Sequence, residues 1–190
     1  MLDLPISDST GNPLVLTTCI DRHTFDSVTC SPQADGFTIL NGLIGASVPK
    51  VQLEAACDES IRRNEVCVLP KDVSFKWRVL LTPTLYSLDP DSRRDASRLM
   101  KDLFSASQAQ KVGASRLLVT HFAYVRKYPE PHIQGIFDAL KDLARGSFLG
   151  LKVLGFEIAA EHLAHFERQL CDTFATQPGA PGEAPQKEAP

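Results

Sequence analysis

The sequence RLLVTHFAYVRKYPEPHIQ, residues 116–134, passes from an apolar run through a polar, aromatic stretch into a helical pattern. Its leucines and valine at 117–119 predict a strand, and the proline at position 131 suits the first turn of a helix. Strands that alternate with helices build open α/β sheets, whose ligands bind beyond the carboxyl ends of the strands. This stretch therefore indicates the fold class and is the first place to look for a functional site.

Three segments, one of which begins within this stretch, show the periodicity of amphipathic helices. Apolar side chains recur at intervals of three and four residues in residues 92–112, 132–146 and 159–174. Ser92 and Asp95 resemble a capping box, and Gly113 stands where such a helix ends. A weaker pattern predicts an earlier helix over residues 49–63.

Apolar runs of strand length alternate with these helices. They occupy residues 13–19, 26–30, 37–40, 65–69, 77–85, 116–123 and 151–158. The last three are nearly continuous, as in strands that are buried on both faces. The order predicts right-handed crossovers and a three-layer α/β/α sandwich. Short strands near the amino terminus would add edge strands and make the central sheet mixed.

The length of 190 residues suits one substantial core. We expect a single α/β/α domain at residues 12–175, preceded by an amino-terminal arm at residues 1–11. Residues 176–190 are rich in proline and glycine and lack large apolar side chains, so they predict a disordered tail.

Composition excludes several classes of protein. A net charge of −3 without a basic tract disfavours nucleic acid as a partner. No apolar run is long enough to span a bilayer, and the first residues do not resemble a secretory signal, which together predict a cytoplasmic protein. Five cysteines without a C-x-x-C pair predict reduced thiols. His162 and His165 lack an evident third ligand, so neither a metal nor a cofactor is expected.

The order of segments from residue 26 to residue 170 resembles the macro domain, a mixed-sheet α/β/α module that binds ADP-ribose and related nucleotides. Residues 38–49, TILNGLIGASVP, are similar to that family's Asn-bearing strand and first glycine-rich loop. Residues 77–85, WRVLLTPTL, are similar to its central strand, and residues 116–124, RLLVTHFAY, to the strand before its second glycine-rich loop. The resemblance implies a nucleotide or ADP-ribose-type small molecule as the ligand.

The second loop departs from the family. Its counterpart, HFAYVRKYPEP at residues 121–131, contains none of the glycines whose backbone amides would wrap a diphosphate. Side chains would have to replace them, and Arg126 can supply positive charge. The candidate ligand-binding residues are Asn41, Gly42, Gly45, His121, Tyr124, Arg126 and Tyr128.

Each candidate also has a structural interpretation. His121 is either a ligand contact or general base, or a buried histidine with satisfied hydrogen bonds. Tyr124 and Tyr128 either stack on a base or cover the sheet edge as part of a partner surface. Arg126 either contacts a phosphate or is solvated. The adjacent Asn41 and glycine form either part of the site or only a turn.

Three functions from different classes remain. The first is a macro-like binding module for a nucleotide or ADP-ribose-type ligand, with an altered or a lost pocket. The second is a degenerate α/β/α domain that acts as a protein-interaction or assembly component. The third is an ADP-ribosyl hydrolase in which Asn41 or His121 positions water. The sequence lacks G-x-G-x-x-G, the P-loop pattern and G-x-S-x-G, which disfavours Rossmann enzymes, P-loop NTPases and serine hydrolases.

Overall fold

The structure of the chain is a computed structural model that describes residues 1–30, 55, 65–69, 78–82, 92–109, 115–120, 130–148 and 150–174. The labelled strands and helices follow one another along the chain. They are β1 (Asp3–Ser7), β2 (Pro13–Thr17), the 3-10 helix η1 (Arg22–Thr24), β3 (Ser27–Cys30), β4 (Cys67–Val68), β5 (Arg78–Leu81), α4 (Ser92–Ala109), β6 (Arg116–Val119), α5 (Glu130–Arg145), β7 (Val153–Phe156) and α6 (Ala160–Phe174).

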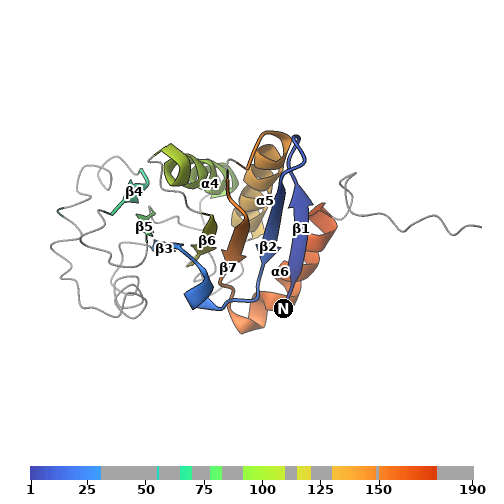
Figure 1. The fold of residues 1–190 in the computed structure, drawn as a ribbon. Helices are drawn as coiled ribbons and strands as arrows, with labels where there is room; N and C mark the ends of the chain where they lie inside the picture. The colour runs from blue at the N-terminus through green and yellow to red at the C-terminus, as the bar shows by residue number, and fades with distance from the viewer. Residues whose placement is uncertain are drawn as a thin grey trace, which may run out of the picture.

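The seven described strands form one mixed sheet in the order β1-β2-β7-β6-β3-β5-β4 (Figure 1). The five strands β2, β7, β6, β3 and β5 run parallel. At the two edges, β1 pairs antiparallel with β2, and β4 pairs antiparallel with β5. The predicted α/β class with a mixed sheet is confirmed.

Helices α4, α5 and α6 form a layer on one face of this sheet. Figure 1 shows α5 behind β7 and β2, with α4 on one side of it and α6 on the other. Phe137 of α5 contacts Phe166 of α6, with ring centroids 5.6 Å apart. Phe166 in turn contacts Phe156 of β7, at 5.3 Å. These rings join two helices to the sheet in one apolar core.

The opposite face of the sheet is covered too. Gly155 points away from Phe156 and its helical layer, because side chains alternate along a strand. Gly155 pairs with Leu118, which pairs with Val28, and both of these side chains are fully buried. A Cβ atom at Gly155 would lie 2.5 Å from the Cζ atom of Phe25. Burial on both faces is what a three-layer sandwich requires.

The described α-helices lie where the sequence predicts them, and every described strand except β1 falls within a predicted apolar run. Ala55 is helical, whereas the rest of the helix predicted at residues 49–63 lies outside the described residues. The predicted strand at 37–40, the helix stop at Gly113 and the tail at 176–190 also lie outside them.

Residues 1–11 are more than the expected arm. Residues 3–7 form β1 because they complete a five-pair ladder with β2, and Ile6 is buried in the core. The turn that follows is held by the carboxylate of Asp8, which accepts hydrogen bonds from Thr10, Asn12 and the amide of Phe148. Burial alone would raise the pKa of the Asp8 carboxyl, but these hydrogen bonds outweigh burial and hold its pKa well below the usual range.

One cysteine differs from expectation. Cys19 and Cys171 are free thiols, as predicted, whereas Cys67 of β4 is disulfide-bonded. The prediction of reduced thiols is therefore wrong for Cys67. An odd cysteine count argues against a complete disulfide framework, but it does not exclude a single bridge between cysteines that the fold brings together.

Candidate functional site

The carboxyl ends of the five parallel strands meet at one edge of the sheet. Three of these strands are followed directly by buried threonines or end in one: β2 ends in Thr17, β5 is followed by Thr82 and β6 by Thr120. Ligands of open α/β sheets bind beyond this edge. A ligand-binding site is therefore expected at this edge.

Within this edge, the direction of the chain reverses between β3 and β6. From β5 the chain returns through α4 to β6 and continues through α5 to β7, which moves it away from β3. β5 itself lies on the other side of β3. Consecutive connections therefore diverge from the β3–β6 boundary, which is the topological switch point where open α/β sheets form a ligand crevice.

The strand pairing opens at the same boundary. Only two residue pairs, Ser27 with Leu117 and Val28 with Leu118, join β3 to β6. Four pairs join β3 to β5 and four join β6 to β7, and both of these ladders continue to the carboxyl ends of the strands. The pairing between β3 and β6 therefore stops before the carboxyl ends of the strands, while each strand keeps its outer neighbour.

Two threonines bridge the strands where the ladder stops, and we call Thr29 and Thr120 the threonine clasp. The Oγ1 atom of Thr29 accepts a hydrogen bond from the Thr120 amide at 2.9 Å and donates one to the Thr120 carbonyl oxygen at 3.3 Å. The Oγ1 atom of Thr120 donates to the Thr29 carbonyl oxygen at 2.5 Å. Thr29 is 0% exposed and Thr120 2%. The clasp thus satisfies backbone groups that the shortened ladder leaves without strand partners.

Helix α5 begins at this edge, ten residues after Thr120 in the sequence. The first residue of α5, Glu130, accepts a hydrogen bond from Gln134 at 3.2 Å. It also contacts His165, at 3.4 Å, and Gln169 of α6. These contacts attach the first turn of α5 to α6, so the amino end of the helix is held at the edge of the sheet.

His132 lies in the same first turn and is 3% exposed. Burial disfavours the charged imidazolium and lowers the pKa of His132 to about 4. The imidazole is therefore neutral in the folded protein near neutral pH. It belongs to the packing of α5 and, although it lies in the stretch at residues 116–134, was not among the candidate ligand-binding residues.

This pKa predicts a pH-dependent loss of stability. The pKa of His132 is lowered on folding, so its contribution is fully present above its unfolded pKa, near 6.5, and is lost as the pH falls toward 4. We expect the free energy of unfolding to fall by up to about 3 kcal/mol across this window, and His132→Gln to remove most of the slope. Urea unfolding at a series of pH values measures it. His23→Gln, on the exposed surface, is the control, and an unchanged slope in His132→Gln would refute the assignment.

The residues proposed from the sequence all follow this edge in the chain but lie outside the described residues. They are Asn41, Gly42, Gly45, His121, Tyr124, Arg126 and Tyr128. The structure describes instead the strand ends that precede them. β3 ends at Cys30, before the candidates at positions 41–45, and Thr120 follows β6, before the candidates at positions 121–128. Sequence reasoning missed both clasp residues. Their signal is a threonine near the end of each apolar run, in SVTC and LLVT.

The part of the chain that the structure describes contains no group of three or more histidine, cysteine, aspartate or glutamate side chains that could hold a metal ion. None of its helices combines the length and the apolar character that crossing a membrane requires.

Comparison with known proteins gives a likeness in structure alone. No protein-family model and no curated protein matches the sequence. Two mutant structures of the Oceanobacillus iheyensis macrodomain superpose on 90% of this chain with TM-scores of 0.60 and 0.65, at 12% identity, and the matches cover 96% and 92% of those chains. The macro domain of ganglioside induced differentiation associated protein 2 matches 88% of this chain and 85% of its own, with a TM-score of 0.55 at 11% identity. The chain therefore has a macro domain-like fold that has diverged far in sequence.

Proposed function

We propose that this chain binds a nucleotide or ADP-ribose-type ligand at the edge of the sheet where the pairing between β3 and β6 stops. The observation that carries the proposal is the two-pair ladder between these strands, at the topological switch point, between two four-pair ladders. The macro domain-like fold supports the choice of ligand class.

The residues that follow the two strands offer the chemistry that such a ligand needs. Asn41 and its neighbouring glycines, after β3, can present an amide and closely approaching backbone N–H groups to a phosphate or ribose. After β6, Tyr124 and Tyr128 provide aromatic faces for a base. Arg126 provides a bidentate donor for phosphate in place of the missing glycine-rich loop. These roles are part of the proposal.

Calorimetric titration with ADP-ribose, ADP and pyrophosphate tests the proposal. We expect ADP-ribose to bind and Arg126→Ala to weaken binding about tenfold or more, because a charge-assisted contact is lost. Pyrophosphate alone should bind more weakly than ADP if a base-stacking contact contributes. The same ligands should raise the unfolding temperature, since they bind only the folded chain.

Arg145→Ala is the matched control, because it also removes one arginine. Arg145 ends α5, about 22 Å along the helix from Glu130 by the rise of 1.5 Å per residue. Its side chain is 78% exposed and pairs with Asp142 at 3.4 Å, so its loss should cost little stability. If both variants weaken ligand binding equally, the effect of Arg126→Ala reflects the net charge of the protein and not a direct contact with the ligand. If no ligand binds at millimolar concentration, the proposal fails and a protein-interaction role becomes the better reading of the fold.

A further inference from the structure

The threonine clasp occupies a position where the sheet could have used apolar side chains. Central strands that are buried on both faces are usually lined by valine, isoleucine and leucine. Val28, directly before Thr29, and Val119, directly before Thr120, follow that pattern. At the next position of β3 and directly after β6, the hydroxyl groups of Thr29 and Thr120 make three hydrogen bonds that join the two strand ends.

The threonine clasp does more than provide hydrogen-bond partners for backbone groups. Backbone pairing would hold the two strands at ladder spacing, and without any bridge the strand ends would be free to spread. Side-chain bridges replace backbone pairing here, at the two strand ends that precede the candidate ligand-binding residues in the chain. Each hydroxyl bonds to the backbone of the other threonine, so the two strand ends are fixed relative to each other in position as well as in distance.

We propose that Thr29 and Thr120 are positioning residues that set the width of the ligand crevice between β3 and β6. The inference rests on the proposed function, because the ligand is the one that the crevice would receive. Neither threonine need touch the ligand. Their effect is to fix the two strand ends that border the crevice, which lowers the free-energy cost of ligand binding.

Thr29→Val and Thr120→Val test this inference, since valine keeps the shape of threonine and removes its hydroxyl. Thr29→Ser restores the hydroxyl and serves as the rescue variant. Thr17→Val is the matched control: Thr17 is buried at the same edge, and its hydroxyl bonds to Asp3 at 2.5 Å and to the amide of Cys19 at 3.0 Å. It lies on β2, which β7 separates from β6. Loss of stability alone should therefore affect all three valine variants alike.

Two measurements separate positioning from stability. The first is the affinity for ADP-ribose, which we expect to fall about tenfold in Thr29→Val and in Thr120→Val. A loss of this size corresponds to the free energy of one hydrogen bond that no longer holds the strand ends in place. Thr29→Ser and Thr17→Val should retain the affinity of the wild type. The second needs no ligand. Hydrogen exchange in peptides from the ends of β3 and β6 should accelerate in the two clasp variants and not in Thr17→Val.

The outcomes distinguish the inference from the function on which it rests. If the wild-type chain binds ADP-ribose and the clasp variants bind it as tightly as Thr17→Val does, the inference is overturned and the proposed function stands. If the wild type binds nothing, the proposed function fails. Unchanged exchange at the strand ends then overturns the inference as well, whereas selectively faster exchange supports the clasp as the device that holds the strand ends. The double variant should show less than additive losses, since both threonines share the same bonds.

Discussion

Replacing Gly135 with alanine is expected to destabilise the protein by about 2–3 kcal/mol, as overpacking in a close helix contact does. A methyl group at this position would overlap the backbone carbonyl oxygen of Arg93 and would lie 3.0 Å from the Cβ atom of Ala96. The backbone oxygen cannot rotate away as the end of a side chain can, so α4 and α5 would have to move apart. The better helix propensity of alanine, about 1 kcal/mol, offsets only part of this cost.

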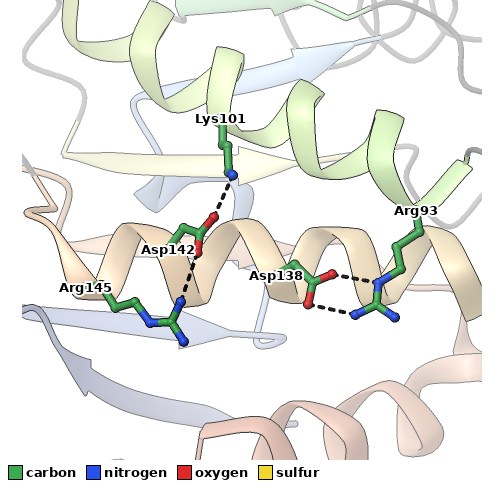
Figure 2. A network of polar contacts seen from close by, with 5 residues as sticks. All are labelled: Arg93, Lys101, Asp138, Asp142 and Arg145. Carbon is green, nitrogen blue, oxygen red and sulfur yellow. Dashed lines mark hydrogen bonds and ion pairs between the residues drawn. The ribbon is translucent and has the colours of Figure 1, made fainter.

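The close approach of α4 and α5 also aligns a set of ion pairs (Figure 2). Arg93 binds Asp138 through two hydrogen bonds, of 2.7 and 3.0 Å, and Lys101 pairs with Asp142 at 2.6 Å. Asp138 lies one turn of α5 after Gly135, on the side that faces α4. The side chains of these pairs are from 35% to 57% exposed, so each pair contributes little by itself. The steric overlap should therefore dominate the loss, and the weakened pairs should add to it.

Gly146→Ala is the control for the Gly135 prediction. Gly146 follows the same helix, and the nearest atom to a Cβ there would be the Leu143 carbonyl oxygen at 3.6 Å, an ordinary contact. Its replacement should change the free energy of unfolding by less than about 0.5 kcal/mol, as a surface substitution does. Urea denaturation of the two variants measures both values. Equal costs at Gly135 and Gly146 would show that α4 and α5 are not packed at this distance.

The helices could be predicted because their signal is local. The apolar stripes of α4, α5 and α6 recur with the helical period within each segment, and that period is independent of what the helix packs against. Gly135 shows the limit of such a signal. It interrupts the apolar pattern of α5, and its low helix propensity predicts a less stable helix at this position. In the fold it is instead a site of close contact with α4.

Strand β1 shows what the sequence alone does not contain. Asp3–Ser7 is short and contains Pro5, which disfavours a central strand and is tolerated only at an edge. Its place is set by pairing with β2 and by the burial of Ile6, both of which depend on residues outside the segment. A local pattern therefore predicted an arm where the sheet has an edge strand.

The candidate site could likewise be predicted only in part. The sequence indicated the segments after two strands, because polar and aromatic residues follow apolar runs there. It could not indicate that the pairing between β3 and β6 stops early, because this depends on the register between two strands whose paired residues Ser27 and Leu117 are 90 positions apart. The clasp is equally non-local: its bonds join Thr29 and Thr120, and neither residue is unusual in its own strand.

Phe137→Ala is expected to cost about 3–5 kcal/mol of the free energy of unfolding, the range for a buried phenylalanine that leaves a cavity. Phe137 is fully buried in α5, and its ring lies 5.6 Å from that of Phe166 and 6.4 Å from that of Phe174, both in α6. Phe166 continues the contact to Phe156 in β7. Alanine would therefore remove the central ring of a chain that joins two helices to the sheet.

A loss of this size is a large part of the 5–15 kcal/mol that stabilises a typical domain, so the midpoint of urea unfolding is a sensitive readout. Phe137→Leu should retain most of the packing and cost less than about 2 kcal/mol. Leu143→Ala, at a half-buried position of the same helix, controls for the loss of apolar surface without a central cavity. Because the cavity would lie between α5 and α6, Phe137→Ala should also speed hydrogen exchange in α6, and Leu143→Ala should not. A Phe137→Ala cost no greater than that of Leu143→Ala would contradict the packing of this ring between the two helices.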